Sequence, residues 1–145
     1  MNNPITQLEQ LTLTSASKRF LRETAKWSFF LSIIGFILIG LMLLLAIFAN
    51  TIFGMAAVMQ PGLPENFGMI MTITYLVLAI IYFFPVYYLL QFSNKMKKAL
   101  STKDDDTLAN AFEMLKAHYK FIGVFTIITL SLYVLLIVVA SLGVL

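Results

Sequence analysis

Three long apolar runs divide the chain, and polar segments separate each run from the next. The runs occupy residues 27–49, 69–92 and 121–145, and none contains a charged residue. A helix rises about 1.5 Å per residue, so about 20 apolar residues cross the hydrocarbon core of a bilayer. The pattern predicts an all-α membrane protein with three transmembrane helices. Its transmembrane domain is expected to cover residues 27–145, after a cytoplasmic tail and amphipathic helix in residues 1–26.

The Lys and Arg residues are confined to two of the polar segments beside these runs. All ten lie either before the first run or between the second and third, in residues 93–120, and the segment 50–68 contains none. Basic flanks resist transfer across a membrane and stay in the cytoplasm. The N-terminus and the loop 93–120 are therefore expected in the cytoplasm, and the outer loop 50–68 and the C-terminus outside.

The segment before the first run has the periodicity of an amphipathic helix. A Ser among residues 15–17 could cap its start. At 100° per residue, Phe20, Leu21 and Trp27 then share one face, and basic side chains share the opposite one. This helix is expected to lie near the headgroups and bend into the first span, with Trp27 at the interface.

The loop 93–120 contains a second amphipathic helix. Its apolar residues follow an i, i+3, i+4, i+7, i+11 series. They could pack against Phe92, Met96 and Leu100, against the N-terminal helix, or against the membrane. The candidate contacts with lipid or a partner, from both amphipathic segments, are Lys18, Arg19, Phe20, Leu21, Arg22, Trp27, Leu108, Phe112, Leu115 and Tyr119.

Proline, glycine and aspartate predict where the helices bend or end. Pro85 leaves the Ile81 carbonyl without its helical donor, so a kink is expected in the second span. That helix is expected to continue to Leu100. Residues 52–59 could form a short interfacial helix, and residues 60–64, with two prolines and a glycine, must turn. Asp106 is expected to cap a helix beginning at Thr107.

The amino-acid composition favours a membrane setting and excludes several classes of site. Of the 145 residues, 60% are hydrophobic and 12% charged, which requires lipid to cover the apolar surface. There is no cysteine, so disulfides and thiolate sites are excluded. The net charge of +3 lies beside the spans and suits anionic headgroups rather than nucleic acid.

Few side chains could act as metal ligands or catalysts. His118 is the only histidine and is interpreted as a solvated interfacial residue. Asp104, Asp105 and Asp106 could bind a divalent cation, but their spacing is not that of a calcium loop. A second alternative is a Cu(I) site formed by the outer methionines. These are Met55, Met59, Met69 and Met71. The overall expectation is no metal, no cofactor and no enzymatic activity, because no nucleophile–base pair or phosphate loop is visible.

Hydroxyl side chains form narrow stripes along each span. Bundle packing through hydrogen bonds is the preferred interpretation, and a solute pathway is the alternative, disfavoured because the spans hold no ionisable acid or base. Gly35 and Gly40 are expected to allow close local packing. The stripes comprise Ser28 and Ser32; Thr72, Tyr75 and Tyr82; and Thr126, Thr129 and Tyr133.

Three motifs resemble a family of small bacterial integral membrane proteins whose function is unknown. They are LRETAKWSFFLSIIGF at residues 21–36, YFFPVYYLLQFS at 82–93 and AFEMLK at 111–116. The resemblance extends over about residues 15–140. It implies a bacterial inner-membrane setting and assigns no functional residue.

The sequence favours a non-catalytic function. The expected role is an accessory or scaffold subunit of a larger membrane complex, or a self-associating membrane component. The alternatives are an oligomeric channel or carrier for a small uncharged solute, and a sensor of anionic lipid surfaces.

Overall fold

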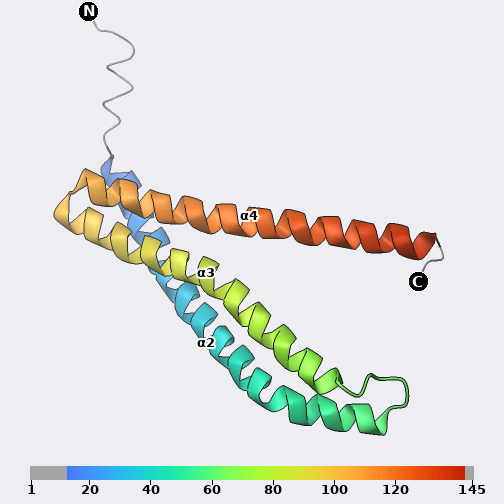
Figure 1. Cartoon of the computed structure of the whole chain (residues 1–145). Coiled ribbons are helices and arrows are strands. Elements are labelled where there is room, and N and C mark those ends of the chain that lie inside the picture. Colours follow the sequence, from blue (N-terminus) through green and yellow to red (C-terminus); the bar gives the residue numbers. More distant parts are fainter. Residues whose placement is uncertain (1–12, 143–145) are drawn as a thin grey trace, which may run out of the picture.

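The computed structural model describes residues 13–142 and forms them into three helices (Figure 1). These are α2 (Ser15–Met59), α3 (Phe67–Thr102) and α4 (Asp105–Ser141). Each is long and apolar enough to cross a membrane. The prediction of an all-α chain with three such helices is confirmed. The first part of the predicted tail, residues 1–12, and the end of the third run, residues 143–145, lie outside the described residues.

Helix α2 is one uninterrupted helix from Ser15 to Met59. Thr14 is its N-cap, and the Thr14 hydroxyl accepts a hydrogen bond from the Ser17 N–H at 3.1 Å. The amphipathic segment, the first apolar run and residues 52–59 therefore belong to one element, so the expected separate interfacial helix is wrong. No proline interrupts this stretch, and the helix ends only where Pro61 and Gly62 follow.

Helices α2 and α3 form a tightly packed antiparallel hairpin. The face of α2 toward α3 carries mostly small residues at helical spacing: Ala25, Ser28, Ser32, Ile39, Ala46 and Ala49 are all buried. Small side chains allow two membrane helices to approach closely. A Cβ added to Gly35 would lie only 2.6 Å from a methyl carbon of Val86. Gly40 has no such neighbour, so only Gly35 fulfils the expected packing role.

The turn between α3 and α4 is shorter than the sequence suggested. Helix α3 continues past the apolar run to Thr102, as expected, and Lys103 adopts a left-handed conformation with φ of 56°. Asp104, not Asp106, is the N-cap of α4: its carboxylate accepts the Asp106 N–H at 3.3 Å and the Thr107 hydroxyl. The extended backbone of Asp104 after the left-handed residue is the conformation an N-cap requires. The pKa of Asp104 is lowered from its usual 3.8, and the largest cause is the hydrogen bond from the Thr107 hydroxyl to its carboxylate.

Helix α3 is the central helix, because it contacts both others while α2 and α4 do not run side by side. Figure 1 shows α4 following α3 from their turn and then diverging from the hairpin. Ala111 is the only buried residue of α4, and no residue in its most apolar stretch is buried. Thr126 and Tyr133 are exposed and Thr129 is half-buried, so this stripe does not pack against both other helices within one chain.

Candidate functional site

The three helices meet at one junction, next to the turn between α3 and α4. Its fully buried residues are Ala25 from α2, Phe92 and Met96 from α3, and Ala111 from α4. The partly buried side chains packed around them are Leu21, Leu100, Leu108, Met114 and Leu115. Of the three packing partners considered for the second amphipathic helix, the structure selects α3, and Leu21 and Ala25 of α2 belong to the same cluster.

Two hydrogen bonds between helices accompany this junction. The Ser93 hydroxyl donates to the Ala25 carbonyl at 2.6 Å and is fully buried, so it joins α3 to α2. The His118 Nδ1 lies 2.7 Å from the Pro85 carbonyl oxygen and joins α4 to α3. A carbonyl oxygen only accepts, so Nδ1 carries the proton. His118 is thus half-buried and bonded to α3, not the solvated residue that the sequence suggested.

The predicted hydroxyl stripes do not supply such bonds between helices. Ser32 is buried against α3 but donates to the Phe29 carbonyl of its own helix at 2.7 Å. Thr72 and Thr129 also bond within their own helices. Sequence reasoning missed Ser93 because it lies just beyond the second apolar run.

Beyond His118, aromatic pairs hold α4 beside α3. Phe84 and Phe121 stack with ring centroids 5.9 Å apart, and Tyr82 meets Phe125 edge to face at 6.5 Å. Large rings on both helices keep the helix axes apart, in contrast to the small-residue contact between α2 and α3.

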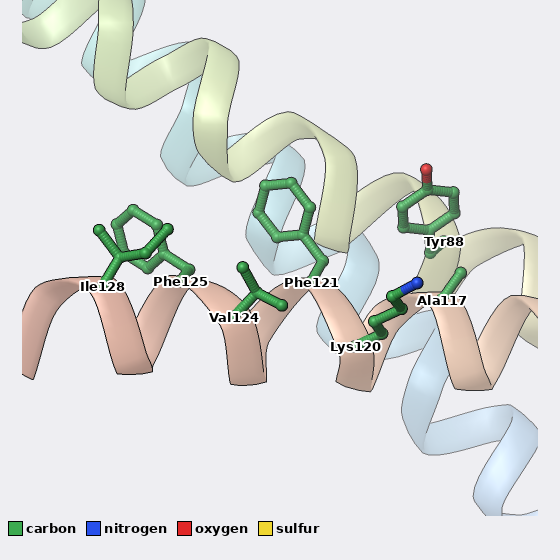
Figure 2. A pocket seen from close by; sticks show the side chains of 7 residues that line it. All are labelled: Tyr88, Ala117, Lys120, Phe121, Val124, Phe125 and Ile128. Carbon is green, nitrogen blue, oxygen red and sulfur yellow. The ribbon is translucent and has the colours of Figure 1, made fainter.

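A groove of about 380 Å³ lies between α3 and α4 at this level. It is lined by Tyr88, Ala117, Lys120, Phe121, Val124, Phe125 and Ile128 (Figure 2). Figure 2 shows Phe121, Phe125 and Ile128 projecting from α4 toward α3, with Tyr88 and Lys120 together at the end nearer Ala117. The groove therefore has one end with an amine and a phenol, and the rest of it is apolar.

The residues predicted to make contacts fall into two groups. Leu21, Leu108 and Leu115 pack around the junction. The other four apolar candidates remain largely exposed: Phe20 at 58%, Trp27 at 66%, Phe112 at 43% and Tyr119 at 64%. The basic candidates Lys18, Arg19 and Arg22 are exposed at the start of α2, where the Arg19 guanidinium lies 5.3 Å from the centre of the Phe20 ring. Their contact with lipid or a partner stays a prediction.

The described residues form no cluster of metal-ligating side chains. Within residues 13–142, no group of three or more His, Asp or Glu side chains is placed to hold a metal ion. The methionines named for Cu(I) lie at the end of the hairpin away from the junction, where Met55, Met59 and Met69 are exposed. Copper binding there stays an untested alternative.

Comparison with known proteins identifies the family. No curated protein and no solved structure matches the chain. A family model described as a family of unknown function, DUF5362, matches residues 50–141. The match includes the motifs at 82–93 and 111–116, the groove and His118, and it leaves out the motif at 21–36. The chain therefore belongs to the DUF5362 family, as its resemblance to a membrane protein family of unknown function implied.

Proposed function

We propose that this protein is a non-catalytic component of the bacterial inner membrane that assembles with a second copy, or with another membrane protein, through the outer half of α4. The observation that carries the proposal is the lack of any buried residue in the most apolar stretch of α4. In the hairpin, by contrast, α2 and α3 bury residues against each other. The most apolar stretch of α4 thus has no residue buried within the chain.

Exposure to lipid alone does not require a protein partner, because lipid tails are as apolar as leucine. The composition of α4 supplies the second argument. Helix association in membranes relies on small and hydroxyl residues, and the outer half of α4 carries Thr126, Thr129, Ser131 and Ser141. The Thr129 and Ser131 hydroxyls donate to carbonyls of their own helix, which leaves their oxygen lone pairs able to accept from another helix.

The proposed orientation places the junction in the cytoplasm and the hairpin loop outside. It rests on the distribution of Lys and Arg residues. The natural chain has no cysteine, so single cysteines introduced at Gly62 and Lys103 report on opposite sides. In intact cells, a membrane-impermeant maleimide should label the Gly62→Cys variant and spare Lys103→Cys until the membrane is opened. The reverse labelling pattern would refute the orientation.

Pro85 is proposed to bend α3 at the level where α4 departs. Proline has no N–H, so the Ile81 carbonyl loses its helical donor. The Pro85 carbonyl also accepts the His118 hydrogen bond, so the interruption in α3 and the attachment of α4 coincide. A bend here would set the angle between α4 and the hairpin, and hence the surface offered to a partner.

Cysteine crosslinking tests the assembly directly. Single cysteines at successive positions from 126 to 141 are oxidised in native membranes, with Ile47→Cys on α2, which is also largely exposed, as the control. Self-association should give disulfide dimers that recur every three or four residues on one face of α4, and none from Ile47. A heterologous partner should instead give co-purification that substitutions on that face abolish. A monomer with neither property would refute the proposal.

A further inference from the structure

The groove between α3 and α4 combines an apolar channel with a single cation at one end. Its lining residues are hydrophobic except for Lys120 and Tyr88. Figure 2 shows both side chains at the end of the groove nearer Ala117, with the Tyr88 hydroxyl directed away from the Lys120 amine. Lys120 is also the last residue before the third apolar run, where the chain is expected to enter the membrane from the cytoplasm. The polar end of the groove thus coincides with the expected level of the lipid headgroups.

We propose that this groove binds one anionic phospholipid, with its phosphate on Lys120 and an acyl chain along Phe121, Val124 and Ile128. The site does not rest on the proposed assembly, although Ile128 also belongs to the segment 126–141 in which that assembly is tested. A Lys ammonium forms charge-assisted hydrogen bonds with phosphate oxygens. The phosphate is therefore held by Lys120 of α4, and the Tyr88 side chain of α3 lines the same end of the groove.

The length of the groove fits one leaflet of a bilayer. From Lys120 to Ile128, α4 advances about 12 Å at 1.5 Å per residue, and half of a hydrocarbon core is about 15 Å. An acyl chain whose headgroup lies at Lys120 can therefore lie against the apolar wall for most of its length. The stacked rings of Phe84 and Phe121, 5.9 Å apart, join the two helices along this wall.

Charge distinguishes the lipid from a second copy of this chain as the occupant. None of the three apolar runs contains Asp or Glu, so a span of another copy inserted into the groove has no anion for Lys120. Anionic headgroups of the cytoplasmic leaflet supply that charge at the required depth. A phospholipid therefore matches both the charged end and the apolar part of the groove, whereas a second apolar helix would match only the apolar part.

Native mass spectrometry of the full chain in mild detergent tests this site. Phosphatidylglycerol and phosphatidylethanolamine with identical acyl chains are titrated separately into wild type, Lys120→Gln and Lys116→Gln. Lys116 is the matched control, because it is an exposed lysine one helical turn away that does not line the groove. Wild type should prefer phosphatidylglycerol, and Lys120→Gln should weaken its binding about five-fold while Lys116→Gln stays within about two-fold.

A second variant tests the apolar part of the site. Val124 is 49% exposed on the groove wall, so Val124→Trp fills the groove without disturbing a packed core. Binding of both lipids should fall, with an unchanged thermal unfolding midpoint as the control for folding. Equal binding of the two lipids by wild type, equal effects of the two lysine variants, or wild-type binding by Val124→Trp would each overturn the proposal.

Discussion

Replacing Gly35 by alanine should weaken the contact between α2 and α3. The added Cβ would lie 2.6 Å and 2.9 Å from the two methyl carbons of Val86. Valine is branched at Cβ and has one strongly preferred rotamer in a helix, so its methyl groups cannot simply rotate away. The helices must separate locally, or Val86 must adopt an unfavourable rotamer.

The size of the effect follows from comparison with Gly40. Alanine at Gly40 meets no atom within 4 Å, so Gly40→Ala measures only the higher helix propensity of alanine, about 0.5–1 kcal/mol. Gly35→Ala gains the same amount and adds the overlap with Val86, for which overpacked cores lose about 1–3 kcal/mol. The free energy of unfolding of Gly35→Ala should therefore lie about 1–3 kcal/mol below that of Gly40→Ala.

Thermal unfolding in one mild detergent, followed by the loss of the monodisperse species, measures this difference. For a chain of this size, 1 kcal/mol corresponds to a shift in Tm of about 2–4 °C. The expected gap between the two glycine variants is thus about 2–12 °C. Val86→Ala removes both methyl groups that the added Cβ would meet. In a protein that already carries Val86→Ala, the further change Gly35→Ala should therefore cause little of the loss of stability that it causes in the wild-type protein.

A double-mutant cycle of Gly35→Ala and Val86→Ala measures the interaction energy between the two positions. If the overlap is the cause, the two substitutions couple favourably by at least about 1 kcal/mol. Additive effects would mean that Gly35 does not approach Val86 in the folded protein. Equal Tm values for Gly35→Ala and Gly40→Ala would lead to the same conclusion.

Three other predictions test the remaining contacts. Gly68→Ala should reduce stability more than Gly35→Ala, because its Cβ would lie 2.5 Å from a backbone oxygen and 2.9 Å from a backbone nitrogen of α2, whereas Gly54→Ala, in open space, should be tolerated in the same Tm measurement. Ser93→Ala should lower the free energy of unfolding by about 0.6–1.7 kcal/mol through loss of the bond to the Ala25 carbonyl, and an unchanged Tm would contradict that role. The pKa of Asp104 is lowered from 3.8, so its carboxylate stabilises the folded chain fully above that pH and this contribution is lost as the pH falls through the lowered pKa. Asp104→Asn should therefore reduce the decline of Tm in acid, and an identical decline in both proteins would exclude this contribution.

Much of the architecture was predictable because membrane length and helix breakers act locally. The three apolar runs predicted the three helices, and residues 60–64 predicted the turn between α2 and α3. The position of the N-cap was missed by two residues, because Lys103 adopts a left-handed conformation that moves the start of α4 to Asp105. The separate interfacial helix was also wrong, since residues 52–59 contain no proline and simply extend α2.

The candidate site was less predictable. Leu108 and Leu115 were selected from the sequence as candidate contacts, and the structure packs them at the junction within the chain. His118 was interpreted as solvated because its partner, the Pro85 carbonyl, lies on another helix and leaves no sign in the surrounding sequence. The lining of the groove was not predicted either, since Tyr88 and Lys120 are distant in sequence and come together only when α4 folds back along α3.

The sequence by itself determined how many helices form and approximately where they begin and end, because about 20 apolar residues and well-placed Pro and Gly residues suffice for that. The tertiary structure decided which faces meet. In these spans almost every side chain is apolar, so hydrophobic periodicity does not distinguish a buried face from one that contacts lipid. Side-chain size makes that distinction: small residues allow α2 to pack closely against α3, and large aromatic rings join α4 to α3 at a greater separation of the helix axes. The separation of α4, and the groove that accompanies it, follow from that difference in side-chain size.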